Sequence, residues 1–383
     1  MARRLSKLLS WGRGVRVLAF VLAILAGSVR AQDPVEDGGS NAAAPFLHAV
    51  VLHDEPAEFR GKLLPPWPRR GQGIRLRASK GRPSTYVSQQ IEAPFPFDRL
   101  LPSWNVDLPR RKNVGFSVAL RVRKKGGTWS PWLDFGGWGK RPVDKAAVTR
   151  WEDGRVAIDD LVGSALFTHA QYRVTARGRG EFVLRRFALC FSARNSGDTS
   201  RARAPGDAPP RRLWVRRLPV PFISQKTDDP RIAHRNCSPT SLSMVMAYRG
   251  VRRDKDDVAR RIFDPEHDIF GNWNRAIEGA FTYGVPGYLA RFSNWNEVKT
   301  LIAKGQPLVI SIKAKKGELT GAPYTWTAGH LLVLCGFDGK GGVLMNDPAA
   351  GRARRGQLTY SMQELSRVWL EKGGTAYVLL PRP

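Results

Sequence analysis

Short runs of alternating hydrophobic and polar residues dominate the first half of the chain. Residues 116–122, Phe-Ser-Val-Ala-Leu-Arg-Val, place an apolar side chain at every second position, and a Gly-containing turn at residues 124–127 follows. The stretches 171–176 and 182–191 show the same period of two. Such alternation predicts half-buried strands, and many short strands separated by turns are typical of an antiparallel sandwich. We therefore predict an all-β, jelly-roll-like sandwich over residues 46–194.

The second half of the chain changes to the helical period and then to buried strands. Leu242, Val245 and Met246 mark one face of a helix that Gly250 would end. Further helices are predicted over residues 257–263 and after the capping residues Asn272, Asn294 and Ser361. Apolar runs predict strands at residues 308–312, 330–337, 343–345 and 376–380. Helices followed by antiparallel strands predict an α+β domain over residues 213–383.

Three segments are predicted to lie outside the folded domains. Residues 1–31 carry a basic start, an apolar core at 17–27 and a Val-Arg-Ala exit at 29–31, which is the pattern of a cleavable secretory signal. An uncleaved anchor is the alternative. Residues 32–45 are small and polar and are expected to be disordered, and residues 195–212 have the composition of a linker. We expect a mature protein outside the cytoplasm, secreted or periplasmic, with no later membrane span.

Charge adds an expectation about partners. The chain of 383 residues has 62 Lys and Arg against 33 Asp and Glu, a formal charge of +29. A surface this basic favours anionic partners such as cell-wall polymers, polysaccharides or lipid headgroups. The basic residues are scattered in twos and threes, so a general preference for Arg is the alternative. We expect no specific nucleic-acid partner.

Cys237 carries the first candidate chemistry. It stands at the start of the predicted helix, where backbone N–H groups and the helix dipole lower a thiol pKa and favour the thiolate. Gln225, which follows an apolar segment, could donate its side-chain amide to an oxygen that becomes negative during acyl transfer. A buried, unreactive thiol is the alternative. That role is expected for Cys190 and Cys335, which fall in apolar strands, although a disulfide between these two is also conceivable.

A base for this thiol is predicted further along the chain. His330 heads an apolar run, and a turn at residues 338–342 leads to a second strand that closes on Asp347. An antiparallel hairpin would bring both residues to one end, so that His330 acts as base and Asp347 orients it. Asn346 is a weaker candidate for the orienting role, and His234 is a spare candidate base. The His residues are too scattered for a zinc site, and we predict no cofactor.

The order of these residues resembles a known family. Gln225, the helix start Cys237-Ser238-Pro-Thr-Ser, Gly-His330 before an apolar strand, and Asn-Asp347-Pro together look like the papain-like cysteine peptidases that process double-glycine (bacteriocin) leader peptides. The stand-alone secreted branch is the most similar. The likeness covers about residues 212–381 and implies a papain-like fold. The family usually has Gly where Ser238 stands, a variant that a helix start tolerates.

We therefore predict a secreted cysteine peptidase that hydrolyses peptide or protein substrates with Cys237, His330, Asp347 and Gln225. Trp273 is expected to line the cleft, with a core position as the alternative. Two other function classes stay open. One is a catalytically silent module that binds cell wall or polysaccharide, and the other is an amidase or transferase that uses the same thiol.

Two features of the first half could bind ligands. Its four tryptophans are predicted to fill the core, with stacking on sugar rings as the alternative: Trp104, Trp129, Trp132 and Trp138. The acidic pairs at residues 152–153 and 159–160 could bind calcium, although paired acids in turns are usually solvated.

Overall fold

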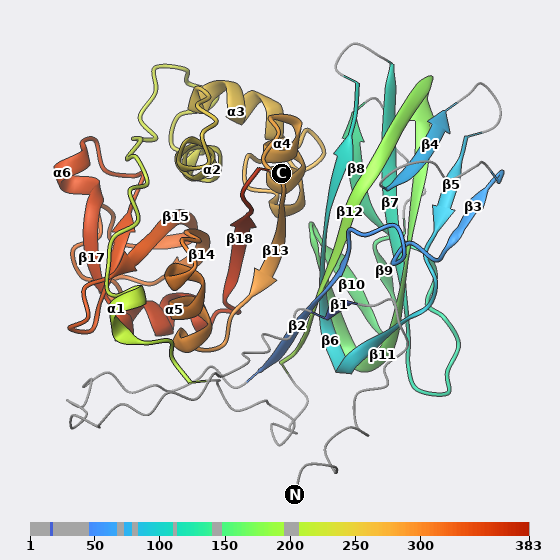
Figure 1. The fold of residues 1–383 in the computed structure, drawn as a ribbon, viewed down its shortest axis with the longest axis horizontal. Helices are drawn as coiled ribbons and strands as arrows, with labels where there is room; N and C mark the ends of the chain where they lie inside the picture. Colours follow the sequence, from blue (N-terminus) through green and yellow to red (C-terminus); the bar gives the residue numbers. More distant parts are fainter. Residues whose placement is uncertain are drawn as a thin grey trace, which may run out of the picture.

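A computed structural model of the protein describes residues 16–17, 46–66, 73–78, 83–109, 113–139, 148–194 and 207–382. Its strands form two sheets, one in each half of the chain. Figure 1 shows the helices gathered around the second sheet, with the strand-rich half beside it. The expected export signal and disordered segment lie outside the described residues, apart from a short strand at Arg16–Val17, and so does most of the expected linker.

The described strands of the N-terminal half form one antiparallel network of 12 strands. They are β1 (Arg16–Val17), β2 (Leu47–His53), β3 (Lys62–Leu64), β4 (Ile74–Ala78), β5 (Thr85–Val87), β6 (Ile91–Asp107), β7 (Val114–Arg123), β8 (Leu133–Gly139), β9 (Arg150–Trp151), β10 (Gly154–Ala157), β11 (Asp160–Gly178) and β12 (Gly180–Ala193). The long strands branch the network: β11 pairs with β5, β6, β7 and β10, and β12 with β2, β4 and β6. The predicted strand at residues 116–122 lies within β7, and its apolar positions are buried.

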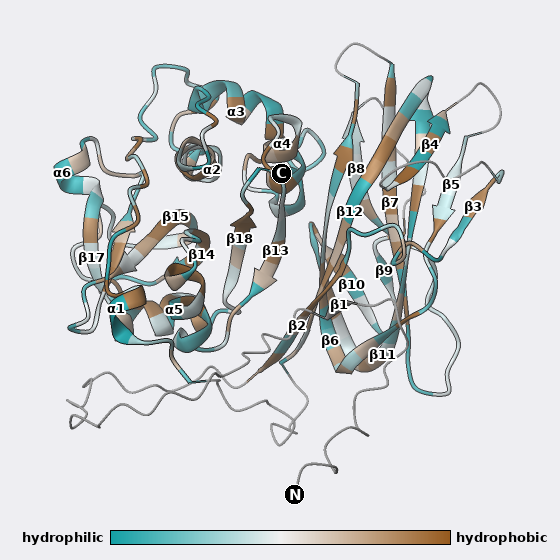
Figure 2. Ribbon diagram, viewed as in Figure 1, coloured by the Kyte–Doolittle hydropathy of each residue, from teal (hydrophilic) through white to brown (hydrophobic). Residues whose placement is uncertain are grey.

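The C-terminal half is a six-stranded sheet in the order β13-β18-β14-β15-β16-β17. Its strands are β13 (Gly287–Arg291), β14 (Leu308–Ala314), β15 (Thr327–Phe337), β16 (Gly342–Asn346), β17 (Gln357–Ser361) and β18 (Thr375–Leu379). Its helices are α1 (Arg211–Trp214), α2 (Cys237–Tyr248), α3 (Lys255–Ile262), α4 (Trp273–Thr282), α5 (Trp295–Ala303), α6 (Ala353–Gly356), α7 (Met362–Leu365) and the π-helix η2 (Ser366–Leu370). In Figure 1, α2, α3 and α4 lie above the strands and α1 and α5 below them. Figure 2 shows hydrophobic colouring on central strands such as β15 and β18, whereas peripheral α6 is hydrophilic.

Local sequence signals explain where these helices begin. Asn272 accepts a hydrogen bond from the Arg275 N–H, and Asn294 accepts one from the Glu297 N–H. Ser361 caps α7 in the same way. The three predicted caps are therefore confirmed. The strands β13 and β17 were not predicted, because each is short and depends on pairing with a distant segment.

The tryptophan prediction holds for two of the four residues. Trp104 and Trp138 are buried, with 1% and 6% of their surface exposed. Trp129 and Trp132 are partly exposed, so the prediction of a core position is wrong for them. Cys190 and Cys335 are buried free thiols, and the disulfide alternative is wrong.

The N-terminal half covers the β13 edge of the six-stranded sheet. The edge strand β13 directs the Leu289 N–H to Ser103 Oγ (2.9 Å) and the Gly287 N–H to Asn105 Oδ1 (3.2 Å). An uncovered edge would leave these backbone groups free to pair with another chain. Two polar side chains of β6 thus take the place of a further strand.

Buried charged side chains also connect the N-terminal and C-terminal halves. Arg291 is 4% exposed and donates to Asp160 Oδ2 at 2.7 Å, while Asp159 accepts the backbone N–H of Trp273 at 2.6 Å. Glu278 of α4 is fully buried and accepts a backbone N–H of β6. Asp159 and Asp160 are therefore junction residues rather than solvated acids. These contacts argue against independent folding of the two halves.

Within the described ranges, no helix is long and apolar enough to cross a membrane. The same part of the chain holds no group of three or more His, Cys, Asp or Glu residues placed to bind a metal ion.

Candidate active site

The helix that carries the candidate nucleophile begins at Cys237. Hydrogen bonds from its serine side chains fix its position. Ser241 Oγ donates to the carbonyl of Leu331 at 2.9 Å, and Ser238 Oγ lies 3.0 Å from the hydroxyl of Tyr377. Because Leu331 follows His330 on β15, the first bond fixes the start of α2 against the strand that carries the candidate base. The Ser238 side chain is buried in the core. Serine in place of the usual glycine therefore adds no side chain to the space beside the thiol.

The surroundings of Cys237 favour its thiolate. Burial raises the pKa of the thiol, but the hydrogen bond and charge of His330 and the backbone amides of Leu331 and Ser238 lower it by more. The result is a pKa below the usual value of a cysteine, on a side chain that remains partly exposed. The other two cysteines are the reverse case, since burial raises the pKa of Cys190 to about 11 and that of Cys335 to about 12.

His330 and Asp347 form a buried ion pair. Nε2 of His330 donates to Oδ1 of Asp347 at 2.8 Å, and the two side chains are 7% and 0% exposed. The other ring nitrogen, Nδ1, is thereby left for Cys237. Burial lowers the pKa of His330, but Asp347 and Cys237 raise it by more, so the imidazolium is favoured. His330 is the fourth residue of β15, not the first as predicted, because the strand begins at Thr327.

Two tyrosines that the sequence did not indicate complete the surroundings of Asp347. Tyr324 and Tyr360 donate their hydroxyls to Oδ2 at 3.1 and 2.8 Å, and the Ala349 N–H donates to Oδ1 at 3.0 Å. Tyr324 also packs edge-on against the His330 ring, with centroids 4.9 Å apart. The pKa of Asp347, which burial would raise, is lowered by His330, Tyr360 and Ala349. Asp347 is thus held ionised and in one orientation.

Gln225 is tied to both sides of this group through its backbone. Its N–H donates to the carbonyl of Pro348 at 2.8 Å, and its carbonyl accepts from Nδ2 of Asn236 at 2.8 Å. Pro348 follows Asp347, and Asn236 precedes Cys237. Within the described chain, the side-chain Oε1 of Gln225 is buried and has no hydrogen-bond partner. The backbone of Gln225 thus links the residue after Asp347 to the residue before Cys237.

Three further predicted residues lie apart from this group. Asn346 accepts from Arg217 at 3.1 Å and donates to a backbone carbonyl of the segment that leads to Gln225, so it holds that segment and does not orient His330. His234 is exposed in a left-handed backbone conformation. Trp273 starts α4 at the domain junction, and none of its contacts recorded in the described chain joins it to Cys237.

An exposed aromatic side chain stands beside the His330 strand. Trp326 is 63% exposed, more than any other large hydrophobic residue in the described chain. It lies between Tyr324, which contacts both Asp347 and His330, and the first residue of β15.

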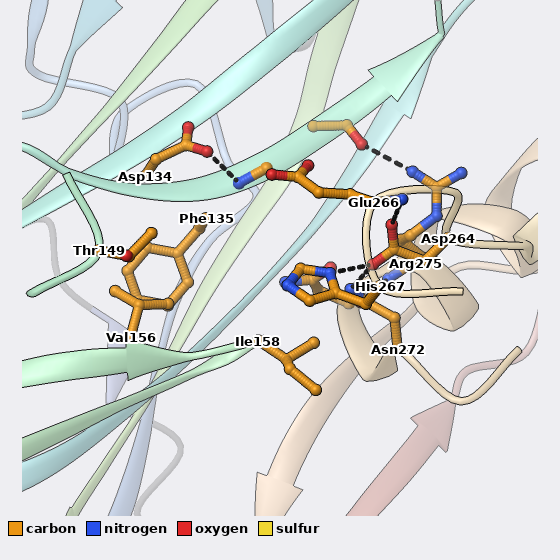
Figure 3. Close-up of a pocket in the computed structure, with 13 residues that line it drawn as sticks. Asp134, Phe135, Thr149, Val156, Ile158, Asp264, Glu266, His267, Asn272 and Arg275 are labelled. Carbon is orange, nitrogen blue, oxygen red and sulfur yellow. Dashed lines mark hydrogen bonds and ion pairs between the residues drawn. The ribbon is translucent and has the colours of Figure 1, made fainter. Parts of the chain in front are cut away.

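A second histidine–carboxylate pair lies in a pocket between the two halves (Figure 3). Nδ1 of His267 lies 2.9 Å from Oδ2 of Asp264, which also accepts from Asn272 at 2.7 Å. Figure 3 shows the His267 ring on the side of the pocket opposite Phe135 of β8, with Asp264 and Asn272 behind it. No cysteine lines this pocket, so the pair has no thiol to activate.

Two family models match parts of this chain. Residues 217–377 match the model of the Peptidase C39 like family, and residues 77–184 match that of the Peptidase C39 N-terminal domain. Among solved structures, a double glycine motif protease from an AMS/PCAT transporter, in complex with the leader peptide, is similar at 23% identity. The alignment covers 43% of this chain and 94% of that chain, with a TM-score of 0.30. A search of curated proteins found no match.

Proposed function

Residues 217–377 are a cysteine peptidase domain of the C39-like family, and on this premise we propose that Cys237 attacks peptide bonds with His330 as its base. Asp347 orients His330 and stabilises its protonated form, and Gln225 stabilises the oxyanion. The continuous chain of contacts from Cys237 through His330 to a buried, fully hydrogen-bonded Asp347 carries this proposal. A nucleophile, a base and a group that orients the base are what thiol catalysis requires.

The reaction begins with the proton of Cys237 on His330. The thiolate attacks the peptide carbonyl, and the resulting oxyanion is held by the Gln225 side chain and the Cys237 N–H. The C–N bond breaks as His330 gives its proton to the leaving amine, which leaves a thioester. His330 then takes a proton from water, the hydroxide attacks the thioester, and the C–S bond breaks. The carboxylic product leaves, and the thiolate–imidazolium pair is restored.

The rest of the chain supports three further parts of this proposal. The basic, apolar and small-residue pattern of residues 1–31 supports export with cleavage after Ala31. Long strands shared between several partners, such as β11 and β12, support a jelly-roll-like sandwich over residues 46–194. The formal charge of +29 includes six basic residues of the segment 1–31, and the chain stays strongly positive after their removal, which supports an anionic polymer as a partner outside the cytoplasm.

The decisive experiment is labelling of the protein with a peptidyl electrophile, followed by mapping of the modified residue. We expect modification of Cys237 alone, and none in the Cys237→Ala variant. A wild-type protein that resists labelling while it remains folded would favour the silent binding module. Analysis of the products released from peptide mixtures separates hydrolysis from amidase or transferase chemistry.

A further inference from the structure

The Trp-Ser-Pro-Trp segment at residues 129–132 lies along β7, on the outer face of the N-terminal half. The Ser130 N–H donates to the Val122 carbonyl at 2.8 Å, and the Val122 N–H donates to Ser130 Oγ at 3.0 Å. The serine hydroxyl thus takes the place of a backbone carbonyl in the pairing with β7. This arrangement directs the two tryptophans to the outer surface, where each is partly exposed.

Three arginine side chains alternate with these two indole rings. The guanidinium carbon of Arg121 lies 4.7 Å from the ring centre of Trp129 and 4.6 Å from that of Trp132. Arg123 lies 4.8 Å from Trp129, and Arg173 of β11 lies 4.6 Å from Trp132. All are within the range of a cation–π contact. We call this continuous stack the Arg–Trp ladder, with the members Arg123, Trp129, Arg121, Trp132 and Arg173.

The ladder concentrates positive charge that the described chain does not pair. Burial and then the neighbouring Arg123 lower the pKa of Arg121. Burial lowers the pKa of Arg173 as well, and Arg177 and Arg121 lower it further, while Asp134 acts in the opposite direction. No ion pair joins a ladder arginine to a carboxylate among the residues the structure describes. Like charges held together in this way are relieved when an anion binds.

Part of the guanidinium edges is already bonded within the protein, since Arg121 Nε and Nη2 donate to Gln171 Oε1 at 2.8 and 2.6 Å and Arg123 Nη2 donates to Gln90 Oε1 at 3.2 Å. The chemistry left open on the ladder is that of the remaining guanidinium N–H groups. Each indole has two guanidinium groups 4.6–4.8 Å from its ring centre, and these groups compete with a sugar ring or a nucleobase for the ring faces. The stacking that single-stranded nucleic acids use is therefore disfavoured. Guanidinium N–H groups bind phosphate oxygens in a bidentate manner, and an indole between successive arginines spaces them along a line.

We propose that the Arg–Trp ladder is a binding surface for a linear phosphate polymer without bases, such as a polyol-phosphate or sugar-phosphate chain. The charge on the ladder complements the charge of such a chain, and the covered indoles discriminate against neutral polysaccharide. This binding is separate from peptide hydrolysis and does not depend on Cys237.

The test measures binding of the protein to long-chain inorganic polyphosphate over a series of salt concentrations. The double variant Arg123→Gln, Arg173→Gln removes both ends of the ladder and keeps the central Trp129–Arg121–Trp132 contacts. Its matched control is Arg150→Gln, Arg155→Gln, which removes the same charge from exposed positions on β9 and β10. We expect the ladder variant to bind about tenfold more weakly at low salt, with the slope of log K against log salt reduced by about two. The control should stay within about twofold of wild type, because it lies outside the ladder.

Four results would overturn the proposal. Equal weakening in both double variants would mean that net charge alone attracts the polymer. A lowered melting temperature with unchanged binding in the ladder variant would mean that the ladder stabilises the fold and does not bind the polymer. Much tighter binding of single-stranded DNA than of polyphosphate at equal charge would mean that bases are read after all. Absence of binding by the wild type would refute the proposal outright.

Discussion

His330 and Asp347 lie 2.8 Å apart in the catalytic domain, and His267 and Asp264 lie 2.9 Å apart at the domain junction. The two distances are nearly equal, but the surroundings differ. The His330 side chain is 7% exposed and its second nitrogen faces a thiol, whereas the His267 side chain is 38% exposed in a pocket without a cysteine. A short histidine–carboxylate distance alone therefore does not identify a catalytic site.

The partners of each carboxylate explain the difference. Asp264 accepts the N–H of Glu266 and pairs through its backbone with Ile269, so its bonds shape one short loop that leads into α4. Asp347 instead accepts hydrogen bonds from the hydroxyl of Tyr324, in the loop before β15, and from that of Tyr360 in β17. Local bonds stabilise a turn, whereas converging distant bonds fix a side chain for chemistry.

The strongest test of this comparison removes each imidazole in turn. His330→Ala should lower kcat/KM by about two to four orders of magnitude, the usual contribution of a general base. His267→Ala should leave it within about twofold, because this pair activates no nucleophile. Hydrolysis of a peptide cleaved by wild type and the rate of Cys237 alkylation give independent readouts. A comparable loss of both rates in a folded His267→Ala protein would contradict the assignment.

Gln225→Ala should lower kcat/KM by about two to three orders of magnitude, the usual cost of losing one oxyanion donor. Alkylation of Cys237 by a small haloacetamide forms no tetrahedral oxyanion, so its rate should stay close to wild type. Ser224→Ala is the matched control, since Ser224 binds the Ala350 carbonyl but lies one residue from the donor. If Ser224→Ala lost as much activity, the effect would belong to the position of the segment and not to the amide.

Much of this site was predictable from sequence, and the remainder depended on tertiary contacts. Cys237 at a helix start and the hairpin from His330 to Asp347 follow from local patterns, and the structure brings these residues together. Tyr324 and Tyr360 were not foreseen, because nothing in a loop or a short edge strand indicates which side chain reaches a distant carboxylate. The sequence alone also allows Asn346 to orient His330, and only the packing of the segment that leads to Gln225 shows that it binds elsewhere.

The pH dependence should separate the two steps of the reaction. The pKa of Cys237 is lowered and that of His330 is raised, so the thiolate–imidazolium pair exists between the two values. Below the Cys237 pKa, alkylation and hydrolysis should both fall, by about tenfold per pH unit. Above the His330 pKa, hydrolysis should fall because the leaving amine receives no proton, while alkylation by the thiolate persists. Profiles of both rates that fall together in alkali would contradict this order of titration.

Removal of the hydroxyls that bind Asp347 should have a smaller effect. Tyr360→Phe and Tyr324→Phe should each lower kcat/KM by about tenfold, since a hydrogen bond to a charged group contributes about 1.5–3 kcal/mol. Each change should also move the alkaline limb of hydrolysis, because it alters the carboxylate that sets the His330 pKa. Tyr283→Phe is the control, as this partly buried tyrosine contacts Arg253 and Arg261 far from Asp347 in sequence. A loss of stability with an unmoved pH profile would leave the tyrosines as packing residues only.

The smallest effect on rate is expected at the junction pair, where the effect should fall on stability. Asp264→Asn places an amide N–H against the Asn272 donor, and the unsatisfied contact should cost about 1–3 kcal/mol of unfolding free energy.

The pKa of Asp264, which burial would raise, is lowered by His267, Asn272 and the Glu266 N–H. A carboxyl with a lowered folded-state pKa stabilises the fold above its unfolded pKa, and this contribution is lost as the pH falls through the folded value. The stability difference between wild type and Asp264→Asn in urea should therefore be full at neutral pH and shrink in acid, while kcat/KM stays within about twofold of wild type. A large loss of kcat/KM without loss of stability would mean that the pocket in Figure 3 takes part in the reaction, and the two histidine–carboxylate pairs would have to be assigned anew.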